Sequence, residues 1–99
     1  MDPIVDLAPG ADDSHLAQFF AERIKARLDE PSARRSFLAL KSTIFVVDFD
    51  SGETISLRFD HGRLTVHEGP LGIPSVTFGG PRRALESLDR VHLSELPGA

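Results

Sequence analysis

Residues 42–67 read STIFVVDFDSGETISLRFDHGRLTVH, and this stretch decides the fold of the chain. Apolar and polar side chains alternate over Glu53–Phe59 and over Arg63–His67, as in β-strands with one buried face. Ser42–Phe49 is apolar on both faces, which favours a strand inside the sheet. The two short turns between these segments each carry a glycine, which tolerates positive φ. The stretch therefore predicts an antiparallel meander of three strands.

A helical pattern precedes the meander. Apolar side chains recur four residues apart from Leu16 to Leu28, which forms one apolar stripe along a helix. Asp13 or Ser14 can cap its first turn. We expect the helix to end near Asp29, because Pro31 pushes the residue before it out of the helical region.

The remaining segments complete a small α+β domain. We expect a short helical segment over Ser32–Leu40, a fourth strand over Ser75–Phe78 and a last helix over Pro81–Leu88. Residues 1–12 are predicted to be an irregular N-terminal arm, and residues 13–99 a single domain. The predicted architecture is an antiparallel sheet of four to five strands with helices packed on one face.

The composition excludes several classes of function. The chain has 99 residues and no cysteine, which rules out disulfides and thiolate chemistry. A formal charge of −4 argues against a nucleic-acid partner, because such proteins present a basic face. The longest apolar run, Ile44–Val47, is far below the ~20 residues of a membrane span, so we expect no stable membrane insertion. The N-terminus lacks the pattern of a signal peptide, so we expect a cytoplasmic location.

Motifs of catalysis and of metal binding do not emerge from the sequence. The aspartate-rich turn after Asp48 resembles the start of a calcium loop, but Phe59 occupies the position that requires a glutamate. His67 with Ser75 or Thr77 could pair a base with a nucleophile, yet the sequence offers no third group to orient them. We therefore expect no enzyme activity, no metal and no cofactor.

Phenylalanine is the distinctive residue of this chain, with seven Phe and neither Tyr nor Trp. Their spacing places them on the inward faces of the first helix and of three strands. Within Ser42–Phe49, alternation puts Phe45 and Phe49 on one face and Ile44 and Val46 on the other, and the two faces are hard to tell apart. These side chains either form a packed core alone or also enclose an apolar ligand.

Residues 54–70, TISLRFDHGRLTVHEGP, resemble the sterol carrier protein 2 family, above all in the run GRLTVHEG. The predicted segments Ser75–Phe78 and Pro81–Leu88 follow in the order of that family, and the resemblance covers roughly residues 14 to 90. It implies a five-stranded, mostly antiparallel sheet with helices over one face. It also implies an apolar tunnel that holds sterols, fatty acids or fatty acyl-CoA. Proteins of that family carry these lipids and do not alter them chemically.

From this resemblance we expect non-catalytic binding of a fatty acid, an acyl-CoA or a sterol-like lipid between the sheet and the helices. Arg82 and Arg83 are expected to hold an anionic head group. The side chains expected to line the pocket are Phe20, Ile24, Phe45, Val47, Phe49, Leu57, Phe59, Phe78, Leu85 and Leu88.

Relatives in that family continue with a further strand and a closing helix, whereas this chain ends at Ala99. An uncovered sheet edge and an open apolar groove both favour association. We therefore expect a homodimer. The alternative function is an interaction or accessory module with a filled core, which dimerises or supports a partner enzyme.

Overall fold

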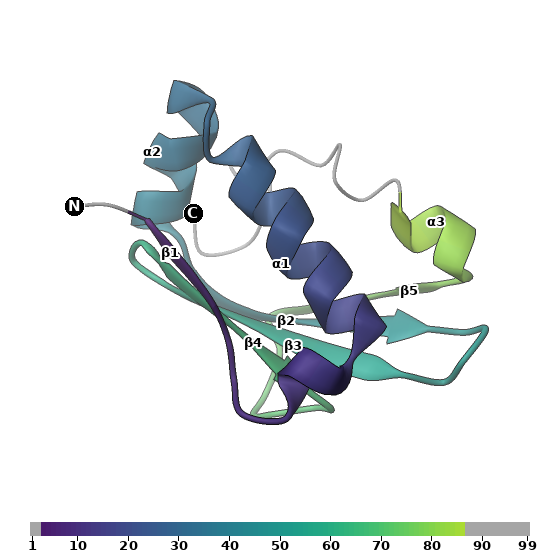
Figure 1. Ribbon diagram of the computed structural model, residues 1–99. Coiled ribbons are helices and arrows are strands. Elements are labelled where there is room, and N and C mark those ends of the chain that lie inside the picture. The colour runs from purple at the N-terminus through teal and green to yellow at the C-terminus, as the bar shows by residue number, and fades with distance from the viewer. Residues whose placement is uncertain (1–2, 87–99) are drawn as a thin grey trace.

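The computed structural model describes residues 3–86 and contains one five-stranded sheet with three α-helices on one of its faces (Figure 1). The α+β class is thereby confirmed. None of the helices in this part of the chain is long and apolar enough to cross a membrane. The elements in chain order are β1 (Ile4–Leu7), the 3₁₀ helix η1 (Ala11–Asp13), α1 (His15–Arg27), α2 (Pro31–Ala39), β2 (Lys41–Asp48), β3 (Thr54–Asp60), β4 (Arg63–Glu68), β5 (Val76–Gly80) and α3 (Arg82–Glu86).

The strand order is β1-β4-β3-β2-β5, and the sheet is mixed. The central meander of β2, β3 and β4 is antiparallel, as predicted. Both outer strands are parallel to their neighbours, β1 to β4 and β5 to β2, which corrects the prediction of an antiparallel sheet. Tight turns fix only the antiparallel pairs of the meander, whereas the outer strands join through longer connections that also permit parallel pairing.

Part of the N-terminal arm, Ile4–Leu7, forms a strand of the sheet, which corrects the prediction of an irregular conformation for these four residues. Within it, β1 pairs along β4, and the Ile4 amide donates to the Gly62 carbonyl oxygen at 2.9 Å. Val5 and Leu7 pack against the core. A strand of four residues is too short for its alternation to stand out in the sequence.

Helix α1 begins where the sequence predicts. The Ser14 side chain accepts a hydrogen bond from the Ala17 amide at 3.1 Å and caps the helix. The same hydroxyl donates to Oε2 of Glu53 at 2.9 Å, which ties the start of α1 to the residue before β3. The helix ends at Arg27, and Pro31 occupies the start of α2, where its missing amide hydrogen costs nothing.

The register between β2 and β3 decides which face of β2 meets the helices. Ile44 lies opposite Leu57, and Val46 lies opposite Ile55; all four are buried. Cross-strand partners share a face, so the even-numbered residues of β2 face the helices. The opposite side of the sheet is called the open face below. It carries Phe45 and Val47 within β2 and Phe49 just after it, which corrects their predicted inward position.

Candidate functional site

The layer between the sheet and the helices brings together most of the predicted lipid-binding residues. They come from elements far apart in the sequence: α1, β3, β5 and α3. They form one apolar cluster, with a hydrocarbon surface that suits an apolar ligand or a packed core. Its buried members among the predicted residues are Phe20, Leu57, Phe59 and Leu85, and Ile24 and Phe78 are partly buried against it.

Three of the predicted pocket residues are separated from this layer by the sheet itself. Phe45, Val47 and Phe49 lie on the open face, and the Phe49 side chain is 68% exposed. The Phe49 ring covers Gly79, because a Cβ atom on Gly79 would lie 2.8 Å from two of its ring atoms. The exposed ring therefore packs against the neighbouring strand of its own sheet. Leu88, the last predicted member, lies outside the described residues.

The predicted head-group arginines have different surroundings. The Nε atom of Arg82 donates to Oδ2 of Asp48 at 2.7 Å, and the Arg82 amide donates to Oδ2 of Asp50 at 2.9 Å. Burial raises the pKa of Asp48, but the hydrogen bonds from Arg82 and from the Asp50 amide outweigh burial and hold it below its usual range. Arg82 therefore holds a carboxylate of its own chain. Arg83 is exposed on α3.

Ser42 is a residue that sequence reasoning missed. It lies on the helix-facing side of β2, opposite Phe59, and only 7% of it is exposed. Its Oγ atom has no hydrogen-bond partner among the described residues. Buried hydroxyl groups in folded proteins are almost always hydrogen-bonded, to protein or to water. The sequence does contain a signal for this residue. Ser42 is a polar side chain at an even-numbered position of β2, in line with the buried Ile44 and Val46.

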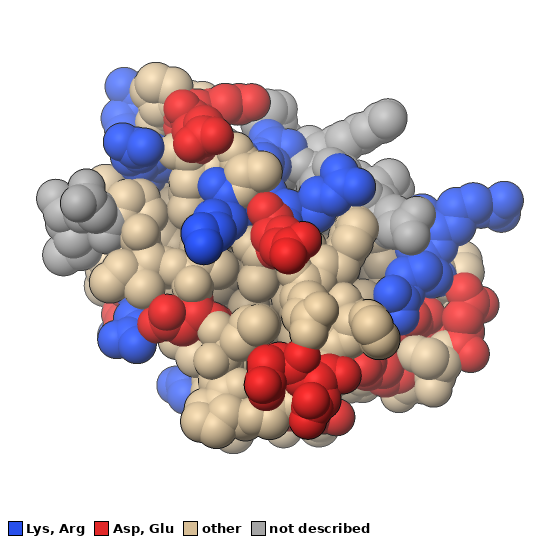
Figure 2. Space-filling model, viewed as in Figure 1, with Lys and Arg blue, Asp and Glu red and all other residues tan. Residues whose placement is uncertain are grey.

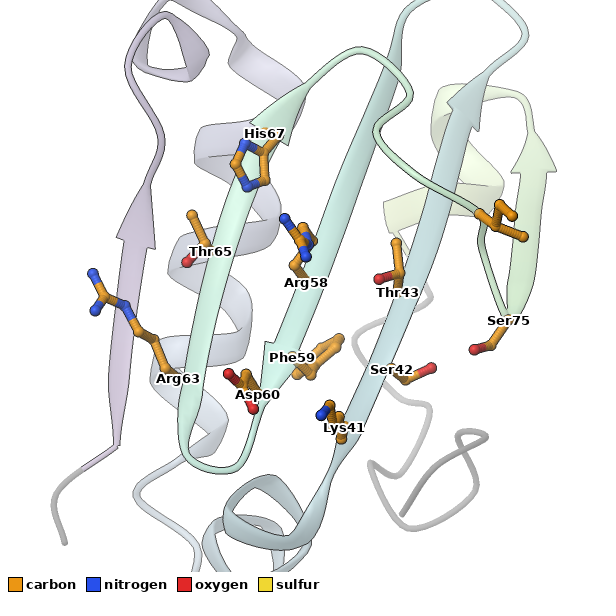
Figure 3. Close-up of a pocket in the computed structure, with 11 residues that line it drawn as sticks. Lys41, Ser42, Thr43, Arg58, Phe59, Asp60, Arg63, Thr65, His67 and Ser75 are labelled. Carbon is orange, nitrogen blue, oxygen red and sulfur yellow. The ribbon is translucent and has the colours of Figure 1, made fainter.

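A second site lies on the open face, where a groove of about 660 Å³ crosses the middle of the sheet (Figure 3). Its walls are mostly polar, in contrast to the apolar layer on the other side. Burial lowers the pKa of His67, and the positive charge of Arg58 lowers it further. The lining residues are Lys41, Ser42, Thr43, Arg58, Phe59, Asp60, Arg63, Thr65, His67, Ile73 and Ser75. Ser42 and Phe59 occupy helix-facing positions of their strands and border the groove only at its edge.

The candidate base and nucleophiles of the sequence do not form a pair. His67 is on β4, Ser75 immediately precedes β5, and Thr77 is within β5. Strands β3 and β2 separate His67 from both hydroxyls, and Figure 3 shows His67 and Ser75 on opposite sides of the groove. Within residues 3–86, no three His, Asp or Glu side chains are grouped to hold a metal ion.

The helical side of the molecule carries charges of both signs. Figure 2 shows acidic and basic side chains interspersed over this side, without an extended patch of either sign among the described residues. The mixture agrees with solvated helix surfaces of alternating charge.

Comparisons with protein-family models, curated proteins and solved structures find no match for this chain. The resemblance to the sterol carrier protein 2 family therefore stays a prediction, which rests on residues 54–70 and on the order of the elements around them.

Proposed function

We propose that this domain binds an apolar lipid without catalysis, between its sheet and its helices. The observation that carries the proposal is the unpartnered hydroxyl of Ser42 at the edge of the mainly apolar layer, beside Phe59. A buried hydroxyl without a partner costs about 1–3 kcal/mol. A ligand with one polar end and a long apolar body supplies the missing partner, and its apolar body packs against the side chains of this layer.

The polar end of this ligand is a neutral group. Ser42 offers a hydroxyl and no charge, and the Nε atom of Arg82 is already held by Asp48. A carboxylate buried here would lose its hydration without gaining that arginine as a counter-ion, which is costly. The site therefore favours a sterol hydroxyl or an acyl ester carbonyl over a free fatty acid. The driving force is the removal of apolar ligand surface from water, at about 25 cal/mol per Å².

The test compares two variants of the delipidated protein. Ser42→Ala removes the buried hydroxyl, whereas Ser32→Ala removes an exposed one on α2. Titration with a fluorescent sterol should show about three- to tenfold weaker binding to Ser42→Ala, the value of one hydrogen bond, and unchanged binding to Ser32→Ala. Native mass spectrometry of the protein as purified should show a mass excess that organic extraction removes.

A fluorescent fatty acid serves as the second ligand. We expect it to bind more weakly than the sterol, because its carboxylate is charged at neutral pH. Equal sterol affinity of the two serine variants would remove the role of Ser42. Absence of any lipid in both experiments would overturn the proposed function.

The alternative, an interaction module, rests on single exposed apolar side chains such as Ile73, which is 92% exposed, and isolated side chains of this kind are ordinary on protein surfaces. Phe49 is the most exposed aromatic residue on the open face, and its ring covers Gly79. The contact with Gly79 accounts for the position of the Phe49 ring without a partner protein. The homodimer and the partner enzyme stay predictions.

A further inference from the structure

The groove on the open face is centred on Arg58, which lies in the middle strand of the meander. The register places Arg58 directly between Thr43 of β2 and Thr65 of β4. Figure 3 shows the three side chains on the same face, with His67 farther along β4. Arg58 thus has a threonine as its cross-strand neighbour on each side, and neither neighbour is a carboxylate that would pair with it.

Positive charges outnumber negative charges in and around this groove. Arg63 forms an ion pair of 2.7 Å with Asp6, and Lys41 lies directly opposite Asp60. Neither Lys41 nor Arg58 forms an ion pair with any residue between 3 and 86. The groove therefore carries an excess of one positive charge although the whole chain has a formal charge of −4.

The neighbours of Arg58 add hydrogen-bond donors to this charge. Two threonine hydroxyls and an imidazole can each donate, and the guanidinium supplies a rigid fork of N–H groups. The acceptor positions of a carboxylate lie in one plane, whereas these donors come from strands on both sides of Arg58. A tetrahedral phosphate group, with oxygens pointing in several directions, can use donors from both neighbouring strands.

We propose that the groove on the open face binds the phosphate group of a phosphorylated molecule, with the fork of Arg58 and the hydroxyls of Thr43 and Thr65 as its donors. Its three donor residues lie on the opposite side of the sheet from the lipid layer; Ser42 borders the groove as well, but the phosphate proposal does not use it. The volume of about 660 Å³ leaves room for a small organic group attached to the phosphate.

The test uses two probes that share a ring and differ in the anion, phenyl phosphate and benzoate. Binding is followed by the shifts of backbone amide signals of β3 and β4 in NMR titrations at fixed pH and ionic strength. We expect phenyl phosphate to bind at least fivefold more tightly than benzoate. Arg58→Gln should weaken phenyl phosphate binding at least tenfold, and Arg58→Lys should fall between, because lysine keeps the charge but loses the fork.

Arg35→Gln is the matched control, because it removes one exposed arginine on α2 and changes the net charge by the same amount. It should bind phenyl phosphate like the unaltered protein. Thermal melting of both variants checks that the fold is intact, and Thr65→Val gives a second test if Arg58→Gln fails to fold. Equal losses in the Arg35 and Arg58 variants, or tighter binding of benzoate, would overturn the proposal.

A phosphate group can belong to a soluble molecule or to a lipid head group. Vesicles of phosphatidylcholine with and without phosphatidic acid separate these two sources. Co-sedimentation that requires phosphatidic acid and is lost in Arg58→Gln assigns a head group. Phenyl phosphate binding without co-sedimentation assigns a soluble ligand. Failure of both probes to bind would overturn the proposal and leave the lipid experiments unaffected.

Discussion

The Nε atom of Arg82 donates a hydrogen bond of 2.7 Å to Oδ2 of Asp48, a residue that is only 1% exposed. This contact joins the end of β2 to the start of α3. The other carboxylate oxygen of Asp48 accepts from the Asp50 amide at 2.9 Å, so the same side chain also shapes the turn after β2. One carboxylate therefore couples the β2–β3 turn to the helix that contributes Leu85 to the core.

Replacing Asp48 with Asn should lower the free energy of unfolding by about 2 kcal/mol, because a hydrogen bond between charged groups is worth about 1.5–3 kcal/mol. The Asn side chain can still accept a hydrogen bond from the Asp50 amide. The measured loss of stability therefore reports the interaction with Arg82 alone. Urea unfolding measures it. Asp29→Asn, an exposed residue after α1, is the control and should change stability by less than 0.5 kcal/mol, the size of an ordinary surface effect.

The same pair predicts a pH dependence. The pKa of Asp48 is lower in the folded protein than the ordinary 3.8 of an aspartate, so the ionised carboxylate stabilises the fold. This contribution is fully present above the unfolded pKa and is lost as the pH falls through the folded pKa. The difference in unfolding free energy between the original protein and Asp48→Asn should therefore be constant from pH 7 to about 5 and shrink below pH 3.8. A difference that grows on acidification would contradict this sign.

The fold of the meander could be predicted because local pattern and turn residues agree there. Period-two alternation and two glycine turns fix three strands and their antiparallel pairing. The parallel pairing of β1 and β5 could not be predicted in this way, since no local signal states which edge a distant strand joins. Alternation also could not orient Ser42–Phe49, because both of its faces are apolar and only the pairing with β3 distinguishes them.

Val46 and Val47 provide a matched test of that orientation. They are neighbours of the same type on opposite faces of β2, with Val46 1% exposed and Val47 partly exposed. Val46→Ala should cost about 2 kcal/mol of stability, from lost burial and the cavity that remains. Val47→Ala should cost at most half as much. Chemical denaturation of the two variants gives the comparison, and a larger loss at Val47 would reverse the assignment of faces.

Phe49 and Gly79 should be energetically coupled. A Cβ atom on Gly79 would lie 2.8 Å from the Phe49 ring, so Gly79→Ala forces the ring to move. Because the ring is exposed, it can swing aside, and we expect a cost of about 1 kcal/mol. In the Phe49→Ala background, Gly79→Ala should be neutral or stabilising, since glycine is unfavourable within a strand by about 0.5–1 kcal/mol. A double-mutant cycle measures the coupling, and strict additivity would show that the contact is absent.

The two candidate sites differ in how far the sequence could predict them. The apolar layer could be anticipated in part, because Phe20, Leu57 and Phe59 repeat at the spacing of their elements. Its polar member, Ser42, could not, since its significance depends on the face that it shares with Phe59. The groove could not be anticipated at all: Thr43, Arg58 and Thr65 lie on three strands and become neighbours only through the register.

His67 should make anion binding in the groove depend on pH. Burial and, to a lesser extent, the charge of Arg58 lower the pKa of His67, so its imidazole is neutral at pH 7.5. A bound anion favours the protonated form, and by linkage protonation favours the anion. Phenyl sulfate is a suitable probe, because its single negative charge does not titrate near neutrality. We expect its affinity to rise several-fold as the pH falls from about 7.5 to about 5.5, through the range of histidine titration.

The other charged groups that line the groove are Lys41, Arg58, Asp60 and Arg63. His67 is the histidine of this lining, and histidine is the residue type that changes charge between pH 5 and 8. His67→Gln should keep the affinity measured at high pH and abolish its rise on acidification, whereas His15→Gln, exposed at the start of α1, should leave the profile intact. A pH profile that survives in His67→Gln would assign the dependence to another group and separate His67 from the site.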